Sequence, residues 1–188
     1  MSLILASKSP RRKEILQMVT NDFVVRVSDA DESYDENMDL SLVPELLAEK
    51  KAKGVKIGEG EVVIGCDTVV LNESKLLGKP KTDDEAIKML KELSNTTHRV
   101  ISGICVTDGV KTISDSITTY VTLRELSDDE IENYVSKFHP TDKAGAYGIQ
   151  ESAGAFVTKI EGDFYNVVGL PLCRLCEILK NDFNIKIL

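Results

Sequence analysis

Three positive charges stand at the start of a predicted helix near the N-terminus, in the stretch SKSPRRKEIL. Ser9 followed by Pro10 is typical of a helix start, because the hydroxyl can cap free N–H groups and proline suits the first helical position. The next residues are Arg11, Arg12 and Lys13. The first turn already carries the positive end of the helix dipole, so each cation there is disfavoured by about 0.3–1 kcal/mol.

An anion-binding site would explain this arrangement. The stretch brings two hydroxyls, Ser7 and Ser9, together with the guanidinium groups of Arg11 and Arg12 and the free N–H groups of a helix start. A guanidinium matches phosphate oxygens in bidentate fashion, and the helix dipole adds to the attraction. The alternative is a solvated surface, and adjacent arginines point about 100° apart on a helix, so one of them can be merely exposed.

Asp67 stands inside the apolar run VIGCDTVV, where a carboxylate needs a partner to offset its desolvation. It could lie at a strand end that reaches solvent, accept a hydrogen bond from a hydroxyl, or act as a metal ligand or general base at a sheet edge. Glu32, in an acidic loop, is its candidate companion. Two carboxylates suit Mg²⁺, which takes oxygen ligands and binds largely through substrate phosphates.

Two lysines and one glutamine complete the candidate set. Lys51 lies in a predicted helix and Lys79 in the turn-like LGKP, and either matters only if the fold brings it toward the arginines. Gln150 ends DKAGAYGIQ, whose small residues either turn tightly or let a ligand approach the backbone. Its amide has a donor and an acceptor, which suits reading the edge of a base.

The elements that must hold these residues alternate early between strands and helices and include a hairpin in the middle. The predicted strands cover residues 3–6, 23–27, 61–71, 98–109, 111–126 and 154–162. The predicted helices cover residues 10–18, 40–55, 82–94, 128–138 and 169–182. The run 61–71 is apolar enough for a central strand, and Thr82 with Glu85 and Ser127 with Glu130 predict capping boxes. The pattern indicates an α/β fold with a mixed sheet.

Composition narrows the class of protein. The 188 residues carry a net charge of -8, which disfavours binding to a nucleic-acid polymer. No apolar run reaches the roughly 20 residues of a membrane span, and we expect no secretory leader. The four cysteines show no disulfide framework, so we expect a cytoplasmic protein.

Seven stretches between residues 3 and 172 together resemble the Maf family, the Maf-like nucleoside triphosphate pyrophosphatases. In chain order they are LILASKSPRRKEIL, EKKAKGV, VIGCDTVV, LGKP, HRVISGI, DKAGAYGIQ and NVVGLPL. The resemblance implies one Maf-like domain over residues 1–188, built around a long mixed sheet with flanking helices. It also implies two lobes with a cleft, similar to the inosine triphosphate pyrophosphatases.

The resemblance further implies hydrolysis of a nucleoside triphosphate to the monophosphate and pyrophosphate, with a divalent cation such as Mg²⁺ or Mn²⁺. Asp67 matches the family's proton acceptor. Arg11, Thr68 and Gln150 match positions that distinguish subfamilies, and these residue types resemble the branch that acts on dTTP and UTP rather than on 7-methyl-GTP. Cys66 stands where alanine is usual, and we expect it to alter packing only.

We therefore expect the loop and helix start at residues 7–12, with Lys51 and Lys79, to bind the phosphates. Asp67, helped by Glu32, would hold the cation and activate water, while Gln150 and Thr68 would address the pyrimidine or its neighbours. Two other classes stay open: a nucleotide-binding regulator of cell division and septum formation with little catalysis, and a scaffold without activity. Homodimer formation also stays open.

Overall fold

A computed structural model describes residues 2–27, 29–35 and 37–187. The strands in these residues are β1 Ser2–Leu5, β2 Phe23–Val25, β3 Glu61–Asn72, β4 Lys75–Leu77, β5 Thr97–Thr107, β6 Thr112–Leu123 and β7 Val157–Glu161. The α-helices are α1 Pro10–Gln17, α2 Val43–Lys53, α3 Asp83–Leu93, α4 Asp128–Phe138, α5 Phe164–Val168 and α6 Leu172–Phe183. Two short 3-10 helices lie at Ala144–Ala146 and Ser152–Phe156.

The strands form one seven-stranded sheet in the order β2-β1-β3-β5-β6-β7, with β4 paired to β3. Strand β1 runs parallel to β2 and β3, whereas the β3–β4 and β6–β7 pairs are antiparallel. The sheet is therefore mixed, which confirms the predicted α/β class. The predicted central position of β3 is also confirmed, since β3 lies between β1 and β5.

Most predicted elements are present, with shifts at their ends. Strand β2 stops at Val25, and β7 starts only at Val157 because Ser152–Phe156 forms a 3-10 helix. Strand β4 and helix α5 were not predicted; they have three and five residues, too few for a periodic apolar pattern.

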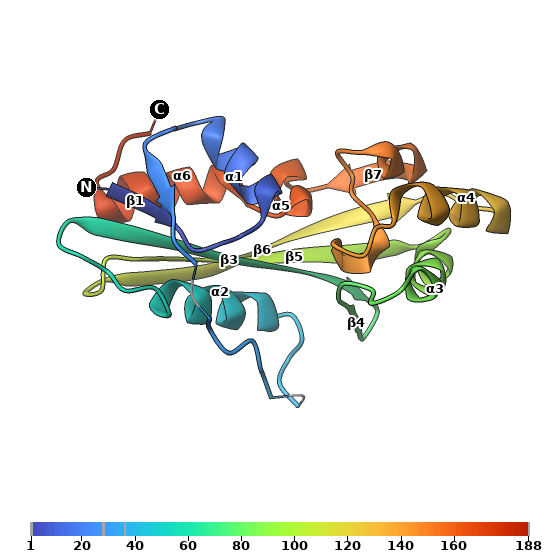
Figure 1. Ribbon diagram of the computed structural model, residues 1–188, viewed down its shortest axis with the longest axis horizontal. Coiled ribbons are helices and arrows are strands. Elements are labelled where there is room, and N and C mark those ends of the chain that lie inside the picture. Colours follow the sequence, from blue (N-terminus) through green and yellow to red (C-terminus); the bar gives the residue numbers. More distant parts are fainter. Residues whose placement is uncertain (1, 28, 36, 188) are drawn as a thin grey trace. The chain divides into compact units, whose positions relative to one another are not determined.

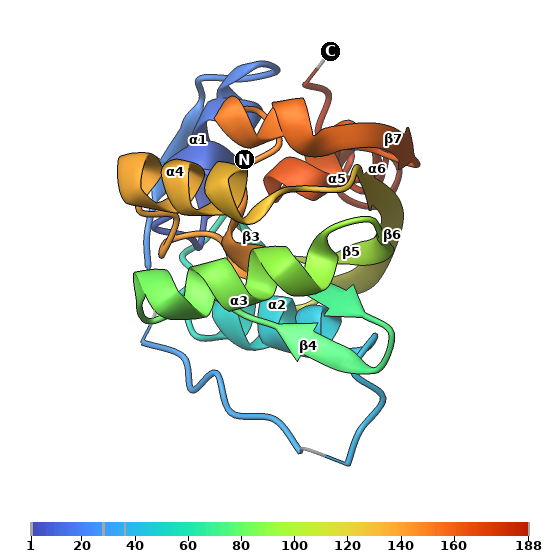
Figure 2. The ribbon, with the colours of Figure 1, turned by 90° about the vertical axis from the view of Figure 1, so that its right-hand side faces the viewer.

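The chain divides into two compact units. Unit 1 comprises the described residues of Met1–Thr68, Ser102–Ile117 and Tyr165–Leu188, and unit 2 comprises Val69–Ile101 and Thr118–Phe164. In unit 2 the amphipathic helices α3 and α4 lie side by side (Figure 2). Two units agree with the expected two lobes, while the expected cleft stays a prediction.

In unit 1, helices cover both faces of the sheet (Figure 1). Leu3 and Leu5 of β1 belong to the core cluster that includes residues of α1 and α6, whereas Ile4 packs in the cluster that includes residues of α2. Helix α2 approaches the sheet closely at Gly65 and Gly103, where an added Cβ would lie 2.2 and 2.1 Å from α2 carbonyl oxygens. These two glycines let the helix backbone rest directly on β3 and β5.

The helix starts differ in how they are capped. Ser127 and Glu130 form the predicted reciprocal capping box. The Thr82 side chain accepts the predicted hydrogen bond from the backbone N–H of Glu85, but the Glu85 carboxylate accepts from the backbone N–H of Lys81, so this box is only half formed. Ser9 is the N-cap residue before Pro10 as predicted, but the hydrogen bond predicted for its hydroxyl is wrong, since its side chain makes no capping hydrogen bond to α1.

Candidate functional site

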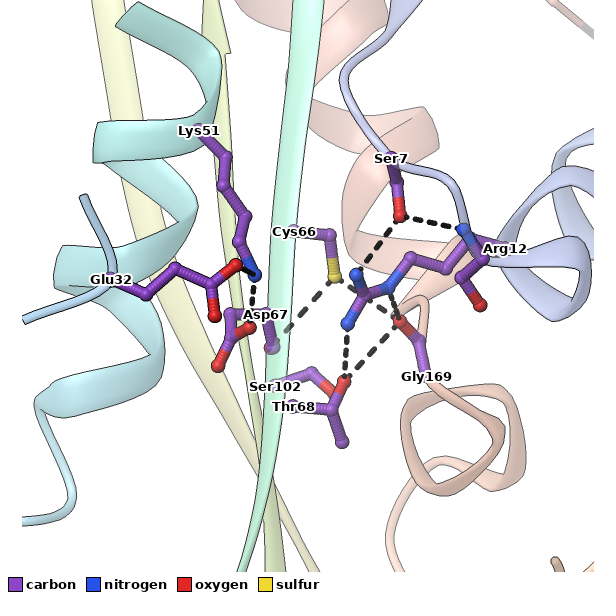
Figure 3. A network of polar contacts seen from close by, with 10 residues as sticks. Ser7, Arg12, Glu32, Lys51, Cys66, Asp67, Thr68, Ser102 and Gly169 are labelled. Carbon is purple, nitrogen blue, oxygen red and sulfur yellow. Dashed lines mark hydrogen bonds and ion pairs between the residues drawn. The ribbon is translucent and has the colours of Figure 1, made fainter. Parts of the chain in front are cut away.

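Two consecutive residues of β3 face opposite sides of the sheet. Side chains alternate along a strand, so Ile64 and Cys66 pack with α1 and α6, whereas Val63 packs with α2. The same alternation turns Asp67 toward α2 and Thr68 toward α1 (Figure 3). The ladder between β1 and β3 ends at the pair of Leu5 and Ile64, so both residues lie just beyond the carboxyl end of β1.

On the α2 side, Glu32, Lys51 and Asp67 form what we call the Lys51 cluster (Figure 3). Lys51 Nζ lies 2.6 Å from Asp67 Oδ1 and 3.1 Å from Glu32 Oε1. The Lys51 and Asp67 side chains are 16% and 13% exposed, whereas that of Glu32 is 63% exposed. Asp67 is thus a partly buried carboxylate with a fixed cationic partner, and Glu32 is the solvent-facing member.

This geometry decides between the structural alternatives for Asp67. Asp67 lies inside β3 and not at its end, and its partner is an ammonium group and not a hydroxyl. The alternatives of a strand end and of a hydroxyl partner are therefore wrong. The expected sheet edge is met locally, because the β1 ladder ends at Ile64 and the β4 ladder begins only at Val70. Its role as a general base or metal ligand stays a prediction.

On the α1 side, Arg12 is held by neutral oxygen atoms in what we call the Arg12 network: Ser7, Arg12, Thr68, Ser102 and Gly169 (Figure 3). Arg12 Nε donates to the carbonyl oxygen of Gly169 at 2.8 Å. Its Nη1 donates to Ser7 Oγ at 3.1 Å, and its Nη2 to Thr68 Oγ1 at 3.3 Å. Among the described residues, no carboxylate pairs with Arg12, so its charge is held in place without being neutralised.

Cys66 lies between the two groups of residues (Figure 3). Its side chain is fully buried, and its Sγ lies 3.2 Å from the carbonyl oxygen of Gly169. Burial raises the pKa of the Cys66 thiol, while the charges of Arg12 and Lys51 act in the opposite direction. The thiol therefore stays protonated at neutral pH.

The remaining basic first-turn residues of α1 have different surroundings. Arg11 is half-buried and makes polar contacts, while Lys13 is exposed. The α1 first turn contains no acidic residue. Ser9 donates its backbone N–H to Ser7 Oγ at 3.3 Å, so Ser7 accepts hydrogen bonds from two groups of the helix start. The structure thus joins Ser7 and Arg12 as predicted; roles for Ser9 and Arg11 in binding stay predictions.

Lys79 and Gln150 belong to unit 2. Both are exposed, and Gln150 Nε2 donates to Glu151 Oε1 at 3.4 Å. Within this unit the backbone N–H of Gly145 donates to the carbonyl oxygen of Gly78 at 3.1 Å, which ties together the segments that carry Lys79 and Gln150. Their part in the site of unit 1 stays a prediction.

A divalent cation fits the Lys51 cluster by the chemistry of its oxygen atoms. The carboxylates of Asp67 and Glu32 already converge on one cationic group, the Lys51 ammonium. Mg²⁺ needs no more than one or two carboxylates when substrate phosphates and waters supply its other ligands. Larger ligand groups, with three or more His, Cys, Asp or Glu side chains, are absent from the described ranges.

Sequence reasoning missed Ser102 and Gly169 as members of this site. Both occur in stretches that carry the family resemblance, but neither has a charge that would draw attention. The usable signals were a hydroxyl inside the apolar run VISGICV and a glycine directly before Leu-Pro. Ser102 is fully buried, so its hydroxyl needs a hydrogen-bond partner inside the protein. Gly169 has a φ of 129°, a backbone conformation that favours glycine.

All four cysteines are free thiols, and the sequence had shown no disulfide framework. Across residues 2–27, 29–35 and 37–187, no helix combines the length and the apolar character that crossing a membrane requires.

A family model and curated relatives match this chain along almost its entire length. The family model described as Maf-like protein matches residues 2–182. A dTTP/UTP pyrophosphatase of Alkaliphilus metalliredigens is 46% identical over 190 residues, covering 99% of this chain and 98% of that protein. A dTTP/UTP pyrophosphatase of Clostridium acetobutylicum is 48% identical over 192 residues, covering 95% and 96%.

Among solved structures, the Ham1 protein of Staphylococcus aureus covers 65% of this chain and 72% of its own, with 17% identity and a TM-score of 0.45. A likeness of this size does not by itself assign a fold.

Proposed function

This chain belongs to the Maf-like protein family, and we propose that it hydrolyses nucleoside triphosphates of the dTTP and UTP type to the monophosphate and pyrophosphate. Relatives 46% and 48% identical along nearly their full length are named for this activity. The observation that carries the proposal is the Arg12 network beside the Lys51 cluster, because an unneutralised guanidinium and a partly buried carboxylate are the two groups that such a hydrolysis needs.

Arg12 supplies the binding of the triphosphate. The guanidinium has more N–H groups than its contacts with Ser7, Thr68 and Gly169 use. Since those contacts are neutral, its positive charge is available to the phosphate oxygens, which it meets in bidentate fashion. Cleavage between the α and β phosphates depends mostly on such charge stabilisation and on positioning.

Asp67 supplies the general base. Its carboxylate is oriented by Lys51, which contacts Oδ1 at 2.6 Å, and it accepts the proton of the attacking water on its other oxygen, Oδ2. Lys51 also brings positive charge to the side of β3 where the phosphates approach Asp67. Asp67 with Glu32 would hold a divalent cation such as Mg²⁺ or Mn²⁺, which supplies neutralisation of phosphate charge and a more acidic bound water.

The remaining residues of the proposal act on binding and base choice. Ser7, Ser9 and Arg11 at the start of α1, together with Lys79, contribute to phosphate binding, and Gln150 reads the pyrimidine edge. For Thr68, the hydrogen bond from Arg12 supports an influence on the substrate through that guanidinium. We further propose that residues 1–188 act as one Maf-like domain; cytoplasmic location and a homodimer stay predictions.

The test is product analysis with the purified full chain. Incubation with Mg²⁺ or Mn²⁺ and a panel of nucleoside triphosphates should release pyrophosphate and the monophosphate in equal amounts, fastest from dTTP and UTP. Release of inorganic phosphate with a diphosphate would contradict the proposal, because the wrong bond would have broken. Tight binding of dTTP without turnover would instead support the nucleotide-binding regulator of cell division.

A further inference from the structure

The NVVGLPL stretch and the serine of HRVISGI have no part in the proposed chemistry, yet both contribute to the Arg12 network. We infer that Gly169 and Ser102 are positioning residues that fix the orientation of the Arg12 guanidinium for the polyphosphate. This inference rests on the proposed function, because it takes the ligand of Arg12 to be the triphosphate of a nucleotide. Neither residue touches the reacting atoms; each acts through Arg12.

The carbonyl oxygen of Gly169 is the main anchor of Arg12. It accepts from Arg12 Nε at 2.8 Å and lies 3.2 Å from the Sγ of Cys66 (Figure 3). The carbonyl points this way because Gly169 follows the last turn of α5 with a φ of 129°, a conformation that side chains rarely adopt. A Cβ there would find space, with Thr68 Oγ1 at 3.7 Å and Arg12 Nε at 3.9 Å, so only the backbone conformation demands glycine.

Ser102 determines which way the Thr68 hydroxyl points its proton. Ser102 Oγ donates its single proton to the carbonyl oxygen of Asn166 at 3.0 Å. It therefore accepts in its 2.8 Å contact with Thr68, and Thr68 must be the donor. The lone pairs of Thr68 Oγ1 then remain for Arg12 Nη2 at 3.3 Å. The hydrogen bonds run in one direction, from Arg12 to Thr68 to Ser102 to the Asn166 carbonyl.

Loss of the Ser102 hydroxyl would disturb this direction. The Thr68 proton would be left with the carbonyl oxygen of Gly169, at 3.4 Å, as its acceptor. That carbonyl already accepts from Arg12 Nε, so the two donors would compete and the guanidinium would loosen. Since a loosened guanidinium binds phosphate less well without changing the base at Asp67, the effect should fall on KM and not on kcat.

The test uses the full chain with Ser102→Ala, Gly169→Ala, the conservative Ser102→Thr and the control Thr107→Val. Thr107 lies in the same strand β5 and has a buried hydroxyl that bonds Lys111 and Thr112, outside the Arg12 network. The control therefore reports the cost of removing a buried hydroxyl without touching Arg12. Ser102→Thr keeps the hydroxyl and should restore the parent behaviour.

Three measurements apply to each variant. The Arg12 Nε–H signal in ¹⁵N NMR, identified by its loss in Arg12→Lys, should exchange with water faster in Ser102→Ala and Gly169→Ala. The Kd of inorganic tripolyphosphate, measured by calorimetry, should rise about 3- to 10-fold in Ser102→Ala, which corresponds to one hydrogen bond. KM for dTTP should rise by the same factor, with kcat within about twofold.

Unchanged exchange of the Arg12 signal in Ser102→Ala would overturn the inference, even if the melting temperature falls, because the serine would then be structural only. If Gly169→Ala fails to fold, Ser102→Ala and Ser102→Thr still decide. A parent chain that hydrolyses no nucleotide would refute the proposed function, but the Arg12 exchange and the tripolyphosphate affinity would still test the positioning roles separately.

Discussion

The two cations beside β3 have opposite kinds of partners. Lys51 is paired with the carboxylates of Asp67 and Glu32, whereas Arg12 is held by hydroxyl and carbonyl oxygens. Lys51 therefore has carboxylate partners, whereas Arg12 has none among the residues that the structure describes. We therefore expect different roles on the two sides of β3: Lys51 orients the Asp67 carboxylate, and Arg12 binds an anionic ligand.

This difference explains why positive charge is tolerated at the start of α1. A carboxylate beside Arg12 would relieve the unfavourable contact with the helix dipole, but it would also compete with a phosphate for the same guanidinium. Neutral acceptors fix the side chain and leave its charge for the ligand. The price in helix stability, about 0.3–1 kcal/mol per cation, is small beside what a bidentate phosphate contact returns.

The largest expected effect is on the Lys51 side. Asp67→Asn should lower kcat by about 10²- to 10⁴-fold, because the amide cannot accept a proton, and should leave KM nearly unchanged. Steady-state pyrophosphate release from dTTP measures both constants. Asp182→Asn removes a carboxylate that pairs with Lys111 at the surface, and it should behave like the parent. Parent-like turnover by Asp67→Asn would refute the base assignment.

A second effect distinguishes the Arg12 side. Arg12→Ala should raise KM for dTTP about 10- to 100-fold, since a charged hydrogen-bond donor to phosphate is lost. Arg12→Lys should restore little of this, because an ammonium group cannot make the contacts of a planar guanidinium. The exposed neighbour Lys13→Ala is the matched control. If Arg12→Ala lowered kcat with KM unchanged, the division between the two sides would fail.

Lys51→Met tests whether the Lys51 ammonium competes with a divalent cation for the carboxylates of Asp67 and Glu32. The ammonium occupies the point on which Asp67 and Glu32 converge, so its removal should lower the Mg²⁺ or Mn²⁺ concentration needed for half-maximal activity. The same change should lower kcat about 10-fold, because Asp67 loses the partner that orients it. Lys50→Met, one residue earlier in α2, removes a lysine that bonds the Ser33 carbonyl and serves as control. An unchanged or higher metal requirement would show that Lys51 does not compete there.

The smallest effect on activity is expected at Cys66, which lies between the Lys51 cluster and the Arg12 network. Cys66→Ala should keep kcat/KM within about twofold of the parent, because a protonated thiol is a weak donor and Arg12 keeps its contacts with Ser7, Thr68 and Gly169. Burial raises the pKa of the thiol, so thiol reagents at neutral pH should label the exposed Cys173 well before Cys66. Mass spectrometry of labelled peptides gives the order. Early labelling of Cys66 would mean that this part of the site opens to solvent.

Local patterns predicted the elements that carry the site. The apolar run of β3, the Ser-Pro start of α1 and the amphipathic character of α3 and α4 are encoded within short stretches of sequence. Glu32 was proposed as the companion of Asp67 from its residue type, and the structure pairs both with Lys51; a shared role in metal binding stays a prediction. Because each of these patterns lies within a short stretch, it can be interpreted without knowing how the rest of the chain folds.

The contacts between distant segments could not be predicted in this way. Nothing in the sequence indicated that Lys51 would lie between Asp67 and Glu32, since that requires the packing of α2 on β3 at Gly65. The anchor of Arg12 at Gly169 joins residues 157 positions apart. Ser9 shows the converse error, where a local pattern predicted a side-chain cap that α1 does not use.

The alternation of side chains at Asp67 and Thr68 makes the site sensitive to strand register. A one-residue insertion in β3 upstream of Asp67 that carried the following residues forward would turn the carboxylate toward α1 and the hydroxyl toward α2. The displaced carboxylate would then pair with Arg12 and compete with phosphate for its guanidinium. Lys51 would no longer contact the general base that it orients. A chain altered in this way could retain its sheet and its core while losing both halves of its chemistry at once.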